Sequence, residues 1–472
     1  MKKTILLVSI IAASSILAAS DVKSVSKADN ESALQNAIQN GKASGQIRYY
    51  YMNEDNAVGL EEYFGSALGG KLKYETASFA GFKAGVAFYT THFLNDNVSS
   101  THVEPAAGNK GSRYVAGLVD TTNQDNKGIT DIGELYLDYK ISKTNITLGR
   151  MKLKTPFINP EDGRMIPTLE QGLWVKSKDI SNIALQGGYI NAFWSRSTPS
   201  WKSVEDSLGN GYARGKAPLA SGLNAAYFGN TSSNGVYVAS AAYSGITNTK
   251  IQIWDYYLEN IMNVAYLQAD YKKKLGDIKM VVAGQYIGEQ EVGDGGNSDD
   301  THPEYSYMLK NEKSQTYGAK VGVGYASSML TLAVTKVTSQ GRFLFPREWG
   351  KEPLFTFQKR ERTDGSGDAT ATLLTLHQDF GMFGLKGFSM LAGIGKYNRV
   401  DAKDWVLNKY GLPSYVQGNL DFGYKFSGSL KGLNAEYIFV RKYAIGNRYD
   451  NANFIFRKND MNIHNFILNY TF

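Results

Sequence analysis

Two charged segments contain the residues best suited to acting on a solute. The first, KTPFINPEDGRMIPTLEQG (154–172), carries the acidic pair Glu161 and Asp162 close to Arg164. Its three prolines stiffen the backbone and cannot donate ladder hydrogen bonds, which predicts a rigid loop. Opposite charges on a rigid loop that folds into a passage would place an electric field across its narrowest point. The alternative interpretation is an ordinary solvated surface loop.

The second segment, PREWGKEPLFTFQKRERTDGSGD (346–368), alternates arginines with aromatic and acidic residues. Arginine stays charged at any relevant pH and can grip a carboxylate with two parallel hydrogen bonds. Arg347, Arg360 and Arg362 are therefore candidates for binding anionic solutes in the mouth of a channel. Equally, these arginines could tie neighbouring loops together by salt bridges.

A further group of basic residues recurs on one face of strand-like segments. These residues either form a basic track for anions or pair with acids on the same face, such as Glu134, Asp138, Asp270, Asp421 and Glu436. Arg150 shares its parity with Ile146 and Leu148, so it lies at a rim unless a bulge turns it inward. The basic residues are Arg48, Lys83, Lys140, Lys272, Lys279, Lys320 and Lys425.

Known catalytic patterns are missing from the chain. The five histidines form no HExxH pair, and no GxSxG or phosphate-binding loop is present. The acidic run GDGGNSDD (293–300) lacks EF-hand spacing and favours a solvated loop over a Ca²⁺ site. We therefore expect no enzyme activity, no cofactor and no metal, and we assign selectivity to charge and constriction.

The elements that would position these residues are strands with a strict period of two. In the terminal NFILNYTF, Phe466, Leu468, Tyr470 and Phe472 share one face. ELYLDYKI, NLDFGYKF and YGAKVGVGY repeat the pattern, with glycine and charges of both signs on the polar face and aromatics near the strand ends. A soluble sandwich would bury the apolar face as its core. Aromatic girdles and a mixed-charge face instead favour a transmembrane barrel with a wet lumen.

Composition is consistent with an exported barrel. The 472 residues include no cysteine and 42% hydrophobic residues, and no apolar run after the N-terminus is long enough for a transmembrane helix. Residues 1–20 have the charged start, apolar core and small-residue end of a signal peptide. Its removal takes Lys2 and Lys3 and lowers the net charge from +7 to +5. No basic cluster indicates a nucleic-acid partner.

Connection lengths predict an all-β, antiparallel barrel of 18 strands. Short turns, expected on the periplasmic side, fall at 140–144, 177–182, 259–261, 275–278, 326–329, 381–386 and 427–432. Segment 222–230 looks like a strand, but only its assignment to a long fourth loop lets short and long connections alternate. The predicted organisation is a signal peptide (1–20), a short periplasmic segment with a helix at 29–41 (21–43) and the barrel (44–472). Loops at about 153–168 and 340–369 are expected to fold inward.

The run LGRMKLKTPFINPEDGRMIPTLEQGLWV resembles the LGR…TP…D-S/G-R-x-x-P…G segment of the OprD-like outer-membrane porins of Gram-negative bacteria. REWGKEPLFTFQKRER is similar to a loop in one branch of that family. The resemblance implies an outer-membrane barrel that takes up small solutes, often carboxylates and amino acids, past a ladder of basic residues. On matching positions, Arg150 and Arg164 would belong to the ladder or constriction, with Asp162 opposing them.

The expected function is passive diffusion of small hydrophilic solutes, with a preference for anionic or carboxylate-bearing nutrients. An adhesin or structural barrel that binds external ligands through its long loops is the alternative. A hydrolase would need a Ser/His pair on the outer face, and a TonB-type transporter would need a plug domain of over a hundred residues. Expected partners are outer-membrane lipid, lipopolysaccharide and the assembly machinery, which would read a C-terminal signal at Tyr470 and Phe472. The chain would be a monomer or a homotrimer.

Overall fold

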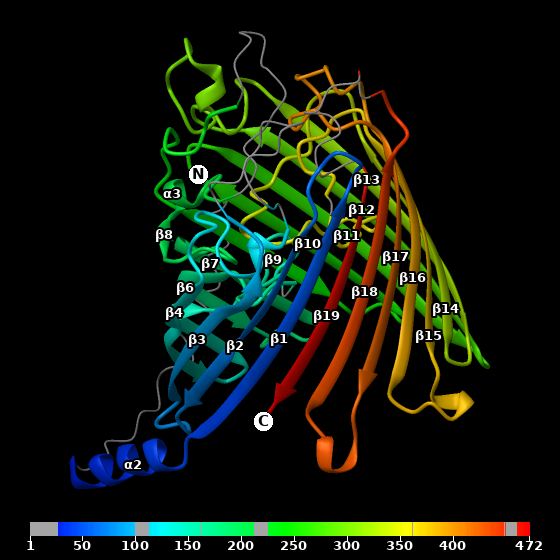
Figure 1. Ribbon diagram of the computed structural model, residues 1–472. Coiled ribbons are helices and arrows are strands. Elements are labelled where there is room, and N and C mark those ends of the chain that lie inside the picture. The colour runs from blue at the N-terminus through cyan, green and yellow to red at the C-terminus, as the bar shows by residue number, and fades with distance from the viewer. Residues whose placement is uncertain are drawn as a thin grey trace.

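Antiparallel β-sheet dominates the protein (Figure 1). The computed structural model describes residues 27–99, 112, 114–161, 163–211, 225–360, 362–447, 449 and 460–472. The strands are β1 (Lys42–Asn56), β2 (Tyr63–Glu75), β3 (Phe82–Asp96), β4 (Gly128–Ile141), β5 (Thr144–Met151), β6 (Leu169–Ser177), β7 (Ile183–Trp194), β8 (Lys202–Ser203), β9 (Val236–Tyr243), β10 (Thr249–Leu258), β11 (Met262–Leu275), β12 (Ile278–Glu291), β13 (Lys313–Tyr325), β14 (Ser328–Val337), β15 (Thr370–Asp379), β16 (Phe388–Asn398), β17 (Tyr415–Lys425), β18 (Leu433–Ala444) and β19 (Met461–Thr471). The helices are α2 (Lys27–Gln39), α3 (Val204–Ser207) and the 3-10 turns η1 (Ala116–Leu118), η2 (Pro303–Tyr305), η3 (Gly381–Phe383) and η4 (Gly428–Leu430).

The sheet closes on itself. β1 pairs with β19 over a register that runs from Gln46 opposite Thr471 to Asn56 opposite Met461. β8 is a two-residue strand beside the end of β7, and β9 pairs with β7 directly, so 18 of the 19 strands form the wall. Closure leaves no unpaired strand edge, which is the condition for a sheet to cross a bilayer. The predicted 18-stranded barrel is confirmed.

Period two separates an inner from an outer face on every strand of the wall. On β19, Asn465 and Ile467 are buried toward the lumen, whereas Phe466 and Phe472 are 40% and 60% exposed. On β4, the outward Leu135 is 54% exposed and the inward Glu134 only 3%. The apolar stripes thus face away from the lumen. The inward side chains are buried because loop residues and other polar groups cover them inside the barrel. Among the described residues, no helix is long and apolar enough to span a bilayer.

All but one of the predicted short turns, together with α2 and the C-terminus, lie at one end, which we call periplasmic as the sequence predicts. The long loops lie at the other, extracellular end (Figure 1). α2 begins at Lys27 and ends at Gln39. Each end lies two residues earlier in the chain than the predicted helix 29–41. β1 begins at Lys42. Of the segment 222–230, the described residues 225–230 form no strand, which agrees with the assignment of this segment to the fourth loop.

One predicted turn is on the wrong side. Residues 259–261 join β10 to β11 at the extracellular end, whereas the sequence placed this connection among the periplasmic turns. The error arises because turn length reflects local backbone chemistry rather than the side of the membrane. Here Asn260 takes a left-handed conformation (φ 60°), which permits a tight reversal between Leu258 and Met262.

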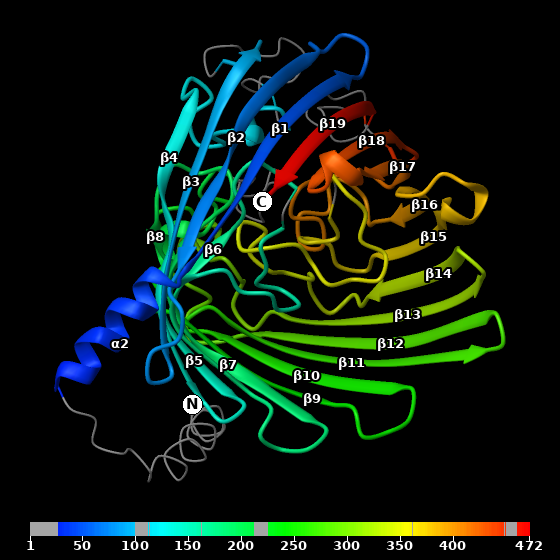
Figure 2. The ribbon, with the colours of Figure 1, turned by 90° about the horizontal axis from the view of Figure 1, so that it is seen from below.

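The hydrophobic core lies inside the barrel, where loop residues pack on the lumen-facing side chains. One large cluster combines Phe157 and Ile158 of the third loop (152–168, loop 3) with Phe343 and Trp349 of the seventh (338–369, loop 7). These pack on wall residues such as Val264. Seen along the barrel in Figure 2, loop segments cross the interior. The lumen is therefore narrowed by folded polypeptide and is not an open hole.

Candidate functional site

Loop 7 contacts the inner wall along the stretch from β12 to β19. Its hydrogen-bond partners come from several strands of this stretch, so the segment lies inside the barrel along nearly half of the wall. The wall partners are Gln285 of β12, Thr335 of β14, Tyr397 of β16, Asp421 of β17, Glu436 of β18 and Asn465 of β19. Any solute that passes through the barrel must pass between this loop and the remaining wall.

Loops 3 and 7 are joined by the side chain of Asn159. Asn159 Nδ2 donates to the carbonyl oxygen of Lys351 at 3.0 Å, and the Lys351 amide donates back to Asn159 Oδ1 at 3.1 Å. Between them, Gly350 approaches loop 3 so closely that an added Cβ would lie 2.3 Å from the carbonyl oxygen of Phe157. Only glycine fits at this position, so the junction of the two loops depends on it.

An aromatic cluster supports this junction. Trp349 stacks on Phe193 of β7 with ring centroids 4.3 Å apart, and its indole N–H donates to Ser207 Oγ at 2.8 Å. Phe157 packs on Phe345 at 4.6 Å. Buried aromatic contacts of this kind contribute about 0.5–1.5 kcal/mol each beyond their buried area. The charged residues of loops 3 and 7 are thus mounted on a rigid apolar base.

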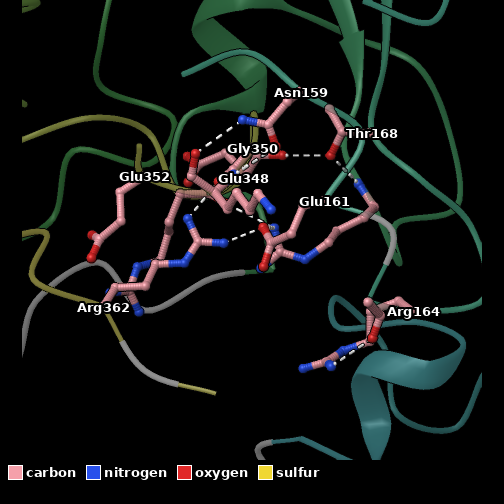
Figure 3. A network of polar contacts seen from close by, with 12 residues as sticks. Asn159, Glu161, Arg164, Thr168, Glu348, Gly350, Glu352 and Arg362 are labelled. Carbon is pink, nitrogen blue, oxygen red and sulfur yellow. Dashed lines mark hydrogen bonds and ion pairs between the residues drawn. The ribbon is translucent and has the colours of Figure 1, made fainter. Parts of the chain in front are cut away.

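Glu161 is the acidic centre of the inter-loop charge network (Figure 3). Its carboxylate accepts from Arg196 of the fourth loop and from Arg362 of loop 7. Arg196 also donates to the carbonyl oxygen of Arg347 at 2.9 Å. Burial alone would raise the pKa of Glu161, but Arg196 and Arg362 hold that pKa below its usual 4.5. Glu161, which the sequence predicts as a constriction residue close to Arg164, is therefore neutralised by two other arginines.

A second charge cluster braces loop 7 from the extracellular side. Arg347 Nε lies 3.1 Å from Asp364 Oδ2, and the Tyr410 hydroxyl donates to the same oxygen at 2.8 Å. Although burial opposes it, Arg347 keeps the pKa of Asp364 below its usual value. Glu352 accepts the amide protons of Thr363 and Asp364, and burial raises its pKa to about 7. Of the three predicted loop-binding arginines, Arg347 and Arg362 are thus used in salt bridges.

The third, Arg360, belongs to a different group, which we call the arginine cluster: Arg48, Arg164 and Arg360. Arg360 Nη2 donates to the Tyr50 hydroxyl and to Asn465 Oδ1, both at 2.6 Å. Arg48 Nε donates to Asn469 Oδ1 at 2.6 Å, and its Nη1 donates to the backbone carbonyl of Arg164. These three side chains therefore meet where loop 3, loop 7 and the β1–β19 wall come together.

Arg164 contributes the guanidinium of loop 3 to the arginine cluster. Its guanidinium lies apart from Glu161 in Figure 3 and donates at 3.0 Å to the carbonyl oxygen of its neighbour Gly163. Burial and the nearby charge of Arg360 lower the pKa of Arg164 from 12.5 to about 10. Within the described residues no carboxylate hydrogen-bonds to Arg164 or Arg360. Asp162, predicted to oppose the arginines, lies outside the described residues.

A basic wall continues from the arginine cluster toward the periplasm. Lys73 Nζ lies 2.9 Å from Glu134 Oε2, and Lys71 Nζ lies 4.0 Å from Glu134 Oε1. Lys71 and Lys152 both line a hollow beneath loop 3. Lys73 also lies 3.6 Å from Glu75 Oε2, so the two acids Glu75 and Glu134 face the four bases Lys71, Lys73, Lys83 and Lys152, which leaves this wall positive.

Most of the predicted basic residues point into the lumen but lie away from the constriction. Lys83 pairs with Glu75, and Lys320 lies over the ring of Phe355 of loop 7 at 4.4 Å. Arg150 donates to Gln171 Oε1 at 3.1 Å and stacks on Trp201 at 4.7 Å, contacts that lie outside the charge network of Glu161. The remaining predicted bases are exposed and lie toward the periplasmic end; they are Lys140, Lys272, Lys279 and Lys425.

Sequence reasoning missed several contributors. Lys71 and Lys73 alternate with the outward Leu72 in GGKLKYE, so the period-two rule applied to this strand would have found them. Arg196 lies in the fourth loop and carries no local signal, because its importance comes only from its contact with Glu161. Within the described residues, no three or more His, Asp or Glu side chains are grouped so that they could hold a metal ion.

Comparison with known proteins agrees with this architecture. Residues 35–471 match the sequence model of the family described as "outer membrane porin, OprD family". The porin-like protein GalP of Pseudomonas putida is 26% identical over 174 residues, which cover 35% of this chain and 39% of GalP. The match thus spans about two fifths of that relative.

Solved structures with low sequence identity have the same fold. OpdK of Pseudomonas aeruginosa, solved with vanillate, is 16% identical with a TM-score of 0.65, covering 92% of this chain and 99% of OpdK. OccK9 (OpdG) of the same organism is 16% identical with a TM-score of 0.70, at the same coverage. A BenF-like porin from Pseudomonas fluorescens Pf-5 is 14% identical with a TM-score of 0.70, covering 92% and 99%. With a family match over nearly the whole length and a closed barrel of 18 strands, the chain belongs to the OprD family of outer-membrane porins.

Proposed function

We propose that this porin is a passive diffusion channel that prefers small carboxylate-bearing solutes and binds them at the arginine cluster. The observation that carries the proposal is the arrangement of Arg164 and Arg360. They come from two different loops and carry like charges close together, while Glu161 is held by Arg196 and Arg362. A carboxylate on a solute would complement this site, because it could accept hydrogen bonds from both guanidinium groups.

The surroundings of the arginine cluster support a small planar anion. Tyr50 is buried. Its hydroxyl accepts a hydrogen bond from Arg360 and donates one to the backbone of loop 3, so it can orient an anion without adding charge. OpdK, a structural neighbour, was solved with vanillate, which is an aromatic carboxylate. We infer the same chemical class here. The solute would then leave along the basic wall that contains Lys71 and Lys73, where positive charge continues to attract it.

The partners follow from the location in the outer membrane. The outward apolar face would contact lipid and lipopolysaccharide, and the barrel would be inserted by the outer-membrane assembly machinery. Tyr470 and Phe472, which are 42% and 60% exposed at the periplasmic end, would form the signal that this machinery reads. The protein would work as a monomer or a homotrimer.

Ion selectivity and solute uptake test the proposal. In planar bilayers, wild-type channels should favour anions, and benzoate should block chloride current at lower concentration than benzyl alcohol does. Arg164→Gln and Arg360→Gln should each raise the benzoate concentration for half block about tenfold, because a charge-assisted hydrogen bond contributes about 1.5–3 kcal/mol. Lys310→Gln is the matched control, since Lys310 is 69% exposed and pairs with Asp300 on an outer loop.

The outcomes separate the possibilities cleanly. Unchanged benzoate block in both arginine variants would reject the arginine cluster as the binding site. A wild-type protein that gives no conductance at all would reject the channel itself.

A further inference from the structure

A hollow on the outside of the barrel is unrelated to the solute path. It has a volume of about 590 Å³ and lies over the extracellular ends of β11, β12 and β13. Its lining side chains Asn263, Gln290 and Lys313 occupy the outward parity of their strands, as do the exposed Leu267, Val282 and Tyr317 farther down the same strands. The hollow therefore opens to the surroundings of the barrel and not to the lumen.

The hollow exists because small residues interrupt the outward face. Gly288 pairs with Ala265 on one side and Gln315 on the other, so one whole row across the three strands has little side-chain volume at its centre. The row above contains Asn263, Gln290 and Lys313, whose longer side chains form the upper rim.

Aromatic rings form the lower rim. Tyr286 and Tyr317 lie in the next row down, directly opposite one another, with ring centroids 5.4 Å apart. The Tyr286 hydroxyl leans over the floor: a Cβ added to Gly288 would lie 2.9 Å from it. Tyrosines at this level mark the boundary between the apolar and polar zones of a membrane. The hollow is thus at headgroup depth on the extracellular side.

The polar groups of the rim suit a phosphorylated sugar. Amides can donate to and accept from hydroxyl groups, and tyrosine rings present a flat apolar body with a polar tip. Lys313 is exposed and makes no ion pair within the described part of the chain, so its ammonium is available to a phosphate. Lipid tails would continue downward along the apolar stripe that contains Val282 and Leu267.

We propose that this hollow is a binding site for the phosphorylated glucosamine headgroup of the outer-leaflet glycolipid, lipopolysaccharide. At the site, amides, a lysine and paired tyrosines surround a glycine floor at the extracellular boundary. The inference rests on the outer-membrane location and not on the solute class, so it can fail while the proposed carboxylate selectivity stands.

Filling the hollow tests the site. Gly288→Leu places a side chain on the floor of the hollow. The φ angle of Gly288 is not in the left-handed region, so the backbone does not require glycine at this position. Gly284→Leu is the matched control: it lies on the same strand and face, with no atom within 4 Å of its added Cβ. Each variant is purified in detergent and titrated with rough lipopolysaccharide, and bound glycolipid is counted by native mass spectrometry.

The expected result is a loss of about tenfold in glycolipid affinity for Gly288→Leu and no change for Gly284→Leu. Lys313→Gln should weaken binding by a similar factor and flatten its dependence on salt, because a phosphate contact is lost. Single-channel conductance of all three variants should match that of the wild type, which confirms that the barrels are folded.

Three outcomes would overturn the proposal. The first is unchanged glycolipid binding in Gly288→Leu. The second is equal affinity for phosphatidylglycerol, which would show that the hollow does not select a sugar headgroup. The third is a dimer of barrels, independent of added glycolipid, that only Gly288→Leu abolishes, since the occupant would then be a second copy.

Discussion

At the scale of single residues, the two loop positions that set the charge of the constriction have unfavourable backbones. Glu161 has φ 38° and Arg360 has φ 79°, in the left-handed region that residues with a Cβ avoid. Such conformations cost about 1 kcal/mol or more each and persist only where surrounding contacts determine them. For Glu161 these contacts are the two arginines, and for Arg360 they are Tyr50 and Asn465. The surrounding contacts, and not the intrinsic backbone preference, therefore hold both residues in place.

A pH titration should follow the charge of Arg164. Because its pKa is lowered to about 10, anion preference should be constant from pH 6 to 8 and should fall as the pH passes about 10. In Arg360→Gln the like charge is gone, so the residual fall should move to higher pH. Reversal potentials recorded in bilayers between pH 7 and 11 give the measurement; an identical midpoint in both proteins would contradict this account of the shift.

The shifted pKa of Arg164 also makes folding stability depend on pH, in a defined direction. A base whose pKa is lower in the folded than in the unfolded protein binds fewer protons when folded between about pH 10 and 12.5. Folding stability contributed by Arg164 therefore rises with pH in that window. Loss of selectivity near pH 10 would thus not be caused by this group unfolding the channel.

At the scale of elements, loops 3 and 7 behave as one unit because each supplies half of a buried charge pair. Glu161→Gln removes the acceptor shared by Arg196 and Arg362 and leaves two buried guanidinium groups without their carboxylate. Breaking a buried pair costs about 3–5 kcal/mol. We expect noisier single-channel current and faster tryptic cleavage in loop 7, with the barrel still intact.

Asp300→Asn is the control for this variant, because it breaks an ion pair that is 71% exposed on the aspartate side and should change neither readout.

Acid should mimic Glu161→Gln only at low pH. The pKa of Glu161 is held below 4.5, so its stabilisation is present above pH 4.5 and is lost as the pH falls through the lower, folded value. Equal noise at pH 5 and pH 3 would argue against Glu161 as the tie between the loops.

At the scale of the whole molecule, the first and last strands hold the barrel shut. The Gly45 amide donates to the carbonyl oxygen of Phe472 at 2.9 Å, and the Phe472 amide donates to that of Gly45 at 3.2 Å. The Phe472 side chain points outward and is 60% exposed, and its ring lies over Gly45. Backbone and side chain at this terminus therefore have separable roles.

Phe472→Ala separates them, because it keeps both backbone hydrogen bonds. If the aromatic terminus is an assembly signal, the amount of folded barrel in outer membranes should fall several-fold, while thermal stability of protein refolded in detergent should change by about 1 kcal/mol or less. Phe466→Ala, on the same outward face of β19, is the control and should assemble normally. Equal membrane levels of the two variants would remove the signal role.

The strand faces and the strand count were predictable from the sequence. Strict alternation in NFILNYTF, ELYLDYKI and NLDFGYKF was enough to assign inner and outer faces, because a side-chain period of two depends only on backbone geometry. The count of 18 strands required one further constraint, that the chain must return to its starting side. Turn 259–261 was misplaced because length alone does not report the side of the membrane.

The constriction was only partly accessible from the sequence. Glu161, Arg164, Arg360 and Arg362 were all identified as candidates, since charge and proline content mark the two loops. Their pairing was not, because Glu161 is neutralised by Arg362, 201 residues away, and by Arg196 of a third loop. Contacts between loops depend on how far each segment reaches across the lumen, which no local pattern records.

Periodicity and composition were sufficient to recognise a membrane barrel with charged, stiffened loops, because both depend on individual residues along each strand. The pairing of the charges depends on the fold. Loop 7 lies inside the lumen and contacts β12, β19 and loop 3, and Glu161 forms its salt bridges there with Arg196 and Arg362. These residues are distant in the chain and become neighbours only when the barrel closes around its loops.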